Sequence, residues 1–305
     1  MAAAGDGADC PARSAATSVL GVRIVSLLPS TTEILYAIGA GDQVVGVTFE
    51  CDYPTEARQR TIVSTSALPA GLSPAQIDAH VSEALARGED LYHLDRDALA
   101  GLDADVVVTQ DLCAVCAMDV SVVDDALAYL GCRAEVITVD PHTIEEVLAS
   151  IGRLGDVTGR STAATTLVDE LRRRLSTVAE RVQRRDRRPR VVVLEWTDPP
   201  YAPGHWVPEM IAAAGGESVL GAVGQPSRRT TWDAVAAADP ELIVVAPCGY
   251  DLVGSQRLAD DLVSRGQLPV GVPVRAVDAN ASWARPGPRL IDGIEELAEI
   301  LADAG

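Results

Sequence analysis

Short runs of β-branched residues recur along this chain, and stretches with helical spacing of apolar residues separate them. This alternation is typical of βα units, which build a parallel sheet with helices on its faces. The predicted strands are Arg23–Leu27, Val44–Thr48, Val106–Thr109, Ala134–Val139, Arg190–Glu195, Leu242–Ala246 and Val274–Val277. The predicted helices between them are 31–38, 74–87, 96–102, 120–130, 207–214, 231–237, 256–264 and 289–304. The chain is therefore predicted to be an α/β protein with two Rossmann-like βα lobes.

A stretch without proline, from Ile144 to about Arg184, separates the two sets of strands and carries apolar residues at helical spacing. Three glycines between Gly152 and Gly159 predict a break there. A longer helix then runs from about Ser161 to Gln183, which is roughly 35 Å at 1.5 Å per residue. This helix is expected to join the lobes, with a ligand cleft between them.

The length of 305 residues exceeds the size at which single hydrophobic cores stop growing. We therefore expect an N-terminal lobe over 23–141, a connecting helical segment over 142–188 and a C-terminal lobe over 189–305. Residues 1–22 are small and polar and are predicted to form a disordered tail.

The charge balance excludes several classes of function. The formal net charge of -19 argues against a nucleic-acid partner, because phosphate binding relies on clustered cationic residues. All 25 cationic residues are arginine, which excludes Schiff-base chemistry and a phosphate loop that needs lysine. No apolar run approaches the roughly 18 residues of a membrane helix, so a soluble protein is expected.

The start of the sequence predicts a location. Residues 1–22 lack the basic start and the apolar core of a secretory signal, and no lipobox surrounds Cys10. A cytoplasmic protein is expected on this ground. An upstream start that encodes a signal would instead make the protein extracytoplasmic.

The loops after the strands hold the unusual residues, and open α/β sheets bind ligands at the carboxyl ends of their strands. Seven of the eleven aromatic residues lie there, namely Phe49, Tyr53, Trp196, Tyr201, Trp206, Tyr250 and Trp283. A core would ordinarily bury such residues, so the pattern favours a flat or apolar ligand, although each could instead plug the end of a sheet. The predicted ligand-binding residues are Ser30, Thr31, Glu50, Tyr53, Trp196, Asp198, Tyr201, His205, Trp206, Tyr250, Trp283 and Arg285.

Cysteine and histidine suggest a second kind of site. Cys113 and Cys116 are spaced as CxxC after a predicted strand, and Cys51 follows a neighbouring strand. With a fourth ligand from His205, Cys248, Glu50 or Asp111, they could hold zinc, iron or an iron–sulfur cluster. Partly buried thiols, a reversible disulfide and redox sensing by the Cys113–Cys116 pair remain open.

Catalytic motifs are missing from the sequence. It has no GxSxG elbow, no HExxH, no GxGxxG after a strand and no EF-hand loop. A binding cleft is thus predicted more readily than an enzyme, and no catalytic residue is assigned.

Four segments carry a family resemblance: Arg23–Glu33, Gly39–Val47, Leu102–Val108 and Ala238–Val245. In these the chain resembles the binding proteins that capture cobalamin and iron–siderophore complexes for ABC importers. The resemblance implies two lobes, one rigid connecting helix and an ABC permease as partner. It also implies that aromatic side chains from both lobes sandwich the ligand, with Tyr53, Trp196, Trp206 and Trp283 as the matching positions.

Two departures point to a signal-less, Cys-containing subgroup. The export signal is not visible, and the Cys51, Cys113–Cys116 and Gly204–Glu209 signatures lie outside the general pattern of the transport family. The leading prediction is a soluble, monomeric binding protein for cobalamin or a related metal tetrapyrrole or metal chelate. The alternative is a cytosolic metalloprotein or enzyme that uses the Cys/His site.

Overall fold

A computed structural model describes residues 21–110, 123, 127–128, 134–183 and 187–303 of the chain. The predicted tail lies almost entirely outside these residues, as do Cys113 and Cys116. Within the described ranges, no helix is both long and apolar enough to cross a bilayer.

The chain divides into two compact units. Unit 1 comprises Met1–Gly71, Ala79–Asp140 and Ile151–Thr165, and unit 2 comprises Leu72–Asp78, Pro141–Ser150 and Thr166–Gly305. Each unit contains a largely parallel sheet, which confirms the α/β prediction with two βα units. The boundaries predicted from the sequence, at 141 and 188, stay a prediction.

Unit 1 is built on a six-stranded sheet with the order β4-β3-β2-β1-β5-β6. Its strands are β1 (Ile24–Ser26), β2 (Val44–Thr48), β3 (Thr61–Ser66), β4 (Tyr92–Leu94), β5 (Val106–Thr109) and β6 (Glu135–Thr138). All neighbours pair in parallel except β3 and β4. Its helical elements are α1 (Pro29–Ala37), the short 3₁₀ turns η1 (Gly41–Gln43) and η2 (Thr55–Gln59), α2 (Pro74–Arg87), which starts in unit 2, and α3 (Arg96–Ala100).

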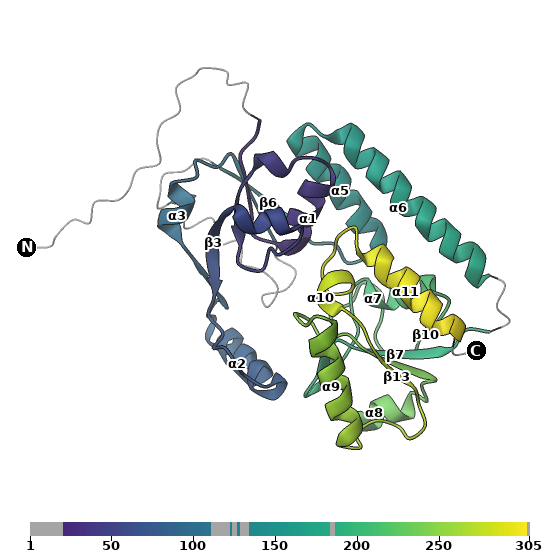
Figure 1. Cartoon of the computed structure of the whole chain (residues 1–305). Coiled ribbons are helices and arrows are strands. Elements are labelled where there is room, and N and C mark those ends of the chain that lie inside the picture. The colour runs from purple at the N-terminus through teal and green to yellow at the C-terminus, as the bar shows by residue number, and fades with distance from the viewer. Residues whose placement is uncertain (1–20, 111–122, 124–126, 129–133, 184–186, 304–305) are drawn as a thin grey trace, which may run out of the picture. The chain divides into compact units, whose positions relative to one another are not determined.

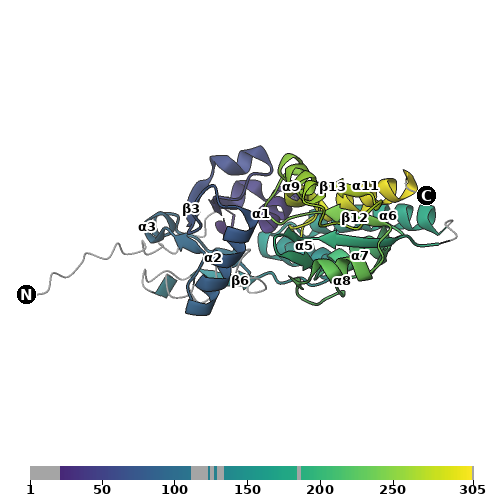
Figure 2. The same cartoon turned by 90° about the horizontal axis from the view of Figure 1, so that it is seen from below.

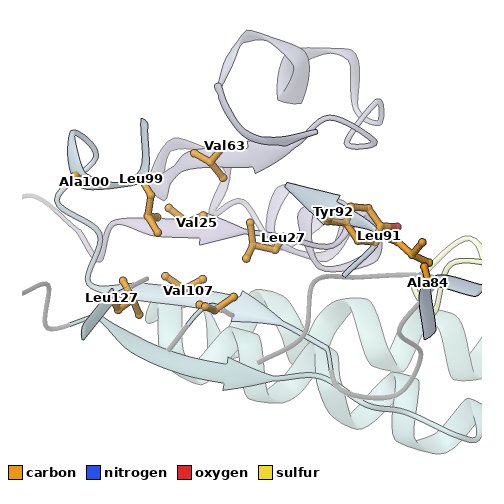
Figure 3. Close-up of a cluster of buried hydrophobic side chains, with 11 residues drawn as sticks. Val25, Leu27, Val63, Ala84, Leu91, Tyr92, Leu99, Ala100, Val107 and Leu127 are labelled. Atoms are coloured by element: carbon orange, nitrogen blue, oxygen red, sulfur yellow. The ribbon is translucent and has the colours of Figure 1, made fainter. Parts of the chain in front are cut away.

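The core of unit 1 forms where β-branched side chains of adjacent strands meet. Val25 in β1 is the register partner of Val107 in β5, and both are fully buried. Figure 3 shows these two side chains beside each other, with Leu99 of α3 close to Val25. Burial of such side chains contributes roughly 1.5–3 kcal/mol each, and this apolar cluster holds the strands whose ends form the loops described below.

Unit 2 has a four-stranded parallel sheet with the order β10-β7-β12-β13. The strands are β7 (Arg190–Leu194), β10 (Glu217–Ser218), β12 (Leu242–Val245) and β13 (Val274–Ala276). The helices α7 (Val207–Ala213), α8 (Trp232–Ala237), α9 (Leu252–Ser264), α10 (Ala279–Ser282) and α11 (Leu290–Asp303) surround it. In Figure 1 strands β7 and β13 lie between α8 and α9 on one side and α7 and α11 on the other. A second, antiparallel sheet consists of β8 (Trp196–Thr197), β9 (Pro200–Ala202) and β11 (Arg228–Arg229).

One face of the parallel sheet in unit 2 packs against α8 and α9. Val192 and Ile243 of the sheet share a buried cluster with Val235 of α8 and Leu262 of α9. Figure 2 shows α9 beside β13, in agreement with their contacts. The side chain of Asp251, just before α9, accepts the Gly254 N–H at 2.8 Å, which satisfies a donor that the first helical turn leaves without a partner.

The segment between the two sets of strands forms two helices, α5 (Ile144–Thr158) and α6 (Ser161–Val182). Gly159 has φ +68°, a left-handed conformation that glycine adopts without strain, and it ends α5 where the glycines predicted a break. Within unit 2, Arg174 of α6 forms ion pairs of 2.6 Å with Asp292 and Glu295 of α11.

Candidate functional site

The end of β1 leads directly into α1, and the predicted residues Ser30 and Thr31 lie in that first turn. The Thr31 hydroxyl lies 2.6 Å from Ser26 Oγ and donates to the Leu28 carbonyl at 3.1 Å. Thr32 Oγ1 donates to Ser26 Oγ at 2.9 Å and is 3.0 Å from Cys51 Sγ. These side chains are all buried. This hydroxyl cluster therefore ties the start of α1 to the loop after β2.

The loop after β2 exposes aromatic surface. Phe49 is 38% exposed and Tyr53 is 50% exposed. Tyr92 is buried beside Phe49, with ring centres 6.1 Å apart, and its hydroxyl donates to the predicted residue Glu50 at 3.3 Å. The Phe49 ring is thus held against a buried ring at the carboxyl end of the sheet in unit 1, and Tyr53 lies exposed in the same loop.

In unit 2 the loop after β7 forms the hairpin of β8 and β9, in which Trp196 and Tyr201 are register partners. The Trp196 ring meets that of Tyr250 edge-on, with ring centres 5.8 Å apart, and its indole N–H donates to the Pro74 carbonyl at 3.2 Å. Both rings are partly buried. Trp196 and Tyr250 therefore form an aromatic pair where β7 and β12 end.

Tyr201 is anchored by its hydroxyl, which donates to Asp78 Oδ1 at 2.9 Å. Asp78 also forms an ion pair with Arg229 of β11. Burial raises the pKa of the Tyr201 phenol and likewise that of Tyr250. Both therefore remain neutral phenols at pH 7 and are poorly suited to bind a metal as phenolate. The Tyr201 proton is used in the bond to Asp78, so only Tyr250 is able to donate a hydrogen bond to a ligand.

Three other predicted residues lie inside unit 2. Trp206 is 6% exposed, Trp283 is 1% exposed and Arg285 is buried. The Trp206 indole N–H donates to the Trp283 carbonyl at 2.8 Å, so the two residues hold each other. In this structure they pack in the core, and neither indole offers an open face.

The neighbour of Trp283 on α11 is Glu296, whose carboxyl is partly buried. Burial raises its pKa, opposed by the nearby indole N–H of Trp283 and assisted by Asp278 and Glu299. Folding thus favours the protonated acid, so its contribution to stability is present near pH 4 and is lost as pH rises through the folded-state pKa. We expect Glu296→Gln to match the parent near pH 4 and to exceed its urea midpoint at pH 7.

The control for that measurement is Glu180→Gln, because Glu180 is exposed on α6. It measures what the loss of one exposed carboxylate does in a chain of net charge -19, and the gain of Glu296→Gln at pH 7 should exceed that effect. A Glu296→Gln variant with the same shift at pH 4 and pH 7 would contradict the raised pKa of Glu296.

Three predicted residues remain, and each has contacts of its own. Asp198, at the tip of the hairpin, forms an ion pair of 3.2 Å with Arg265. His205 precedes α7, and its ring centre lies 5.6 Å from that of Trp206. Cys51 belongs to the hydroxyl cluster, and among the described residues no group of three or more His, Cys, Asp or Glu could hold a metal ion. The predicted zinc or iron–sulfur site has no support in this part of the chain.

One residue next to the predicted site residue His205 was not predicted from the sequence. The ring of His142, which lies between β6 and α5, is 5.7 Å from that of His205 by their centres. The two histidines are far apart in the sequence, and no spacing rule links them. Only the fold of unit 2 could identify them as a pair.

Residues 24–265 match the family described as periplasmic binding protein, which is well over half of the chain. The chain belongs to this family. Among curated relatives, an uncharacterized ABC transporter substrate-binding lipoprotein of Bacillus subtilis (strain 168), YvrC, is 26% identical over 92% of this chain and 79% of its own length. A vitamin B12-binding protein of Yersinia pestis (strain Pestoides F) is also 26% identical, over 92% of this chain and 86% of its own.

Solved structures of periplasmic binding proteins share the fold. The vitamin B12-binding protein BtuF of Vibrio cholerae has a TM-score of 0.64 at 20% identity, covering 93% of this chain and 98% of BtuF. A periplasmic heme-binding protein of Pseudomonas aeruginosa has a TM-score of 0.68 at 20% identity, covering 92% of this chain and 93% of its own. At these identities the likeness concerns the fold alone.

Membership of this family settles three predictions. The resemblance to substrate-binding proteins of ABC importers is confirmed, and the chain is a binding protein rather than an enzyme. The prediction of a cytoplasmic protein is wrong, because the family is periplasmic and the Bacillus relative is a lipoprotein. It rested on a missing signal pattern in residues 1–22, and such an absence does not decide where a chain acts.

Proposed function

We propose that this protein captures cobalamin, or a related metal tetrapyrrole or metal chelate, outside the cytoplasmic membrane and passes it to an ABC permease. The relatives named for vitamin B12 and heme support this class of ligand. The Bacillus relative, named as an ABC transporter lipoprotein, supports both the location and the permease.

The observation that carries the proposal is the placement of aromatic rings beyond the carboxyl ends of strands in both units. Phe49 and Tyr53 follow β2, while Trp196 and Tyr250 follow β7 and β12. A flat macrocycle that covers such rings gains roughly 0.5–1.5 kcal/mol per ring pair beyond the buried area. The neutral phenol of Tyr250 could donate a hydrogen bond to its polar rim.

Electrostatics favours a neutral member of this ligand class. The chain carries a formal net charge of -19, which repels anionic chelates over long range at low salt. Cyanocobalamin has no net charge and escapes this repulsion. We therefore place it ahead of heme, whose propionates are anionic.

The test is a titration of the purified protein with cyanocobalamin, heme and ferric citrate, followed by tryptophan fluorescence. Saturable quenching by cyanocobalamin at a lower concentration than by the other two is the expected result, because Trp196 is partly exposed. Absence of saturable binding by all three would refute the proposal.

A variant pair assigns the binding surface. Tyr53→Ala is expected to weaken ligand binding by about 5- to 30-fold, as expected when an aromatic side chain in a binding site is truncated. Val270→Ala is the control, because Val270 is fully exposed in the loop before β13, at the amino end of the sheet in unit 2. Equal dissociation constants for Tyr53→Ala and Val270→Ala would remove the loop after β2 from the site.

A further inference from the structure

The histidine pair of unit 2 has an unusual hydrogen-bonding state. Nδ1 of His142 and Nε2 of His205 are both buried, and neither has a hydrogen-bond partner. Buried polar atoms almost always have partners, and leaving one without a partner is costly. Two such nitrogens on adjacent rings make this pair a candidate binding site.

The backbone of His205 is held in a conformation that favours this arrangement. Its φ of +49° is left-handed, which is uncommon for residues other than glycine. Its N–H donates to the Gln225 carbonyl at 2.6 Å, and its carbonyl accepts the Gly224 N–H at 2.9 Å. Backbone strain that is held so firmly is typical of binding sites, because it aims a side chain.

The two rings are close to the distance at which they could share a metal ion. A metal–imidazole bond is about 2.0–2.1 Å and a ring nitrogen lies roughly 1.1 Å from the ring centre, so two rings on adjacent positions of one metal have centres about 4.5–5.2 Å apart. The observed 5.7 Å is slightly longer, so a small rotation of the two side chains would bring both rings onto one metal.

The surroundings add negative charge. Glu146 accepts the His142 backbone N–H at 2.5 Å, and Glu209 accepts the Ile144 N–H at 2.8 Å. No third His, Cys, Asp or Glu among the described residues completes a metal site. A metal bound here must therefore bring its other ligands with it.

We propose that His142 and His205 form a two-imidazole site that coordinates two adjacent positions of a divalent transition metal, carried as a hydrated ion or as an open chelate. Imidazole suits zinc, copper and nickel. Heme and cobalamin leave open only positions on opposite faces of the macrocycle, so the pair cannot bind either of them with both rings. The site is therefore independent of the ligand proposed above.

The experiment uses the full chain without an affinity tag and titrates it by calorimetry with NiCl₂ and, separately, with Ni²⁺–nitrilotriacetate, which has two adjacent open positions. One equivalent of the nitrilotriacetate complex is expected to bind. Loss of either imidazole should weaken binding by at least about tenfold, because the second ligand then no longer acts within the same molecule. Binding of NiCl₂ alone would identify the hydrated ion as the source and would still support the site.

The variants are His142→Asn and His205→Asn, because asparagine tolerates the left-handed conformation of His205. The chain has four histidines, so His80→Asn with His93→Asn is the matched control and should bind as the parent does. Affinity unchanged in His142→Asn or His205→Asn indicates an adventitious ion only and overturns the proposal. So does near-ultraviolet thiolate-to-nickel absorption, which would place the metal on cysteine. Cyanocobalamin binding is measured in the same variants. It should be unchanged, because the histidine site is independent of that ligand, so failure of this site can be told apart from failure of the proposed function.

Discussion

Replacing Trp283 with alanine is expected to lower the free energy of unfolding by about 3–5 kcal/mol. Its side chain is 1% exposed and lies beside Gly293 of α11, where an added Cβ would be only 3.3 Å from the indole nitrogen. The truncation leaves a cavity that close helix packing cannot refill. Because domains are stable by about 5–15 kcal/mol, this is a large part of the total.

Urea unfolding measures the effect, with Trp196→Ala as the matched control. Trp196 is partly exposed, and it loses its hydrogen bond to Pro74 and its contact with Tyr250, which together should cost about 1–2 kcal/mol. For ligand binding we expect the opposite order: folded Trp196→Ala should bind the ligand more weakly than folded Trp283→Ala. A Trp283→Ala variant as stable as the parent would show that the indole is not part of the core.

Replacing Gly204 with alanine is expected to cost about 3 kcal/mol, the upper end for overpacking. An added Cβ would lie 2.1 Å from Ser227 N, 2.5 Å from the Pro226 carbonyl carbon and 2.6 Å from Gln225 O. All three are backbone atoms, so no side chain can rotate away. The loop that positions His205 would have to separate from residues 225–227, and the His205 N–H would lose its bond to Gln225.

Gly152→Ala is the matched control for that substitution. Gly152 lies within α5, and nothing stands within 4 Å of an added Cβ. Alanine is the better helix former there and should raise the free energy of unfolding by about 0.5–1 kcal/mol. The two Gly→Ala changes are thus expected to have opposite signs in the same urea assay. A destabilisation of less than 0.5 kcal/mol in Gly204→Ala would contradict the packing of this loop.

Strands that are buried on both faces could be predicted from the local sequence pattern. Val44–Thr48 and Val106–Thr109 were predicted with the bounds they have as β2 and β5, because a run made almost entirely of β-branched residues suits such a strand. Strand β3, Thr61–Ser66, was missed, since its β-branched run of three residues is short and its second half alternates Ser and Thr. It becomes a strand by pairing with β2 and β4.

The sequence by itself determined that aromatic residues gather after strands, and this follows from the order of βα units along the chain. Only the tertiary structure decided that Tyr53 is exposed while Trp206 and Trp283 are buried, because loops fold over one another in ways that no local period records. The same reason applies to His142 and His205, whose 5.7 Å contact joins two loops distant in the sequence. Periodicity determines which face of an element is apolar, whereas contact between loops depends on how whole elements pack.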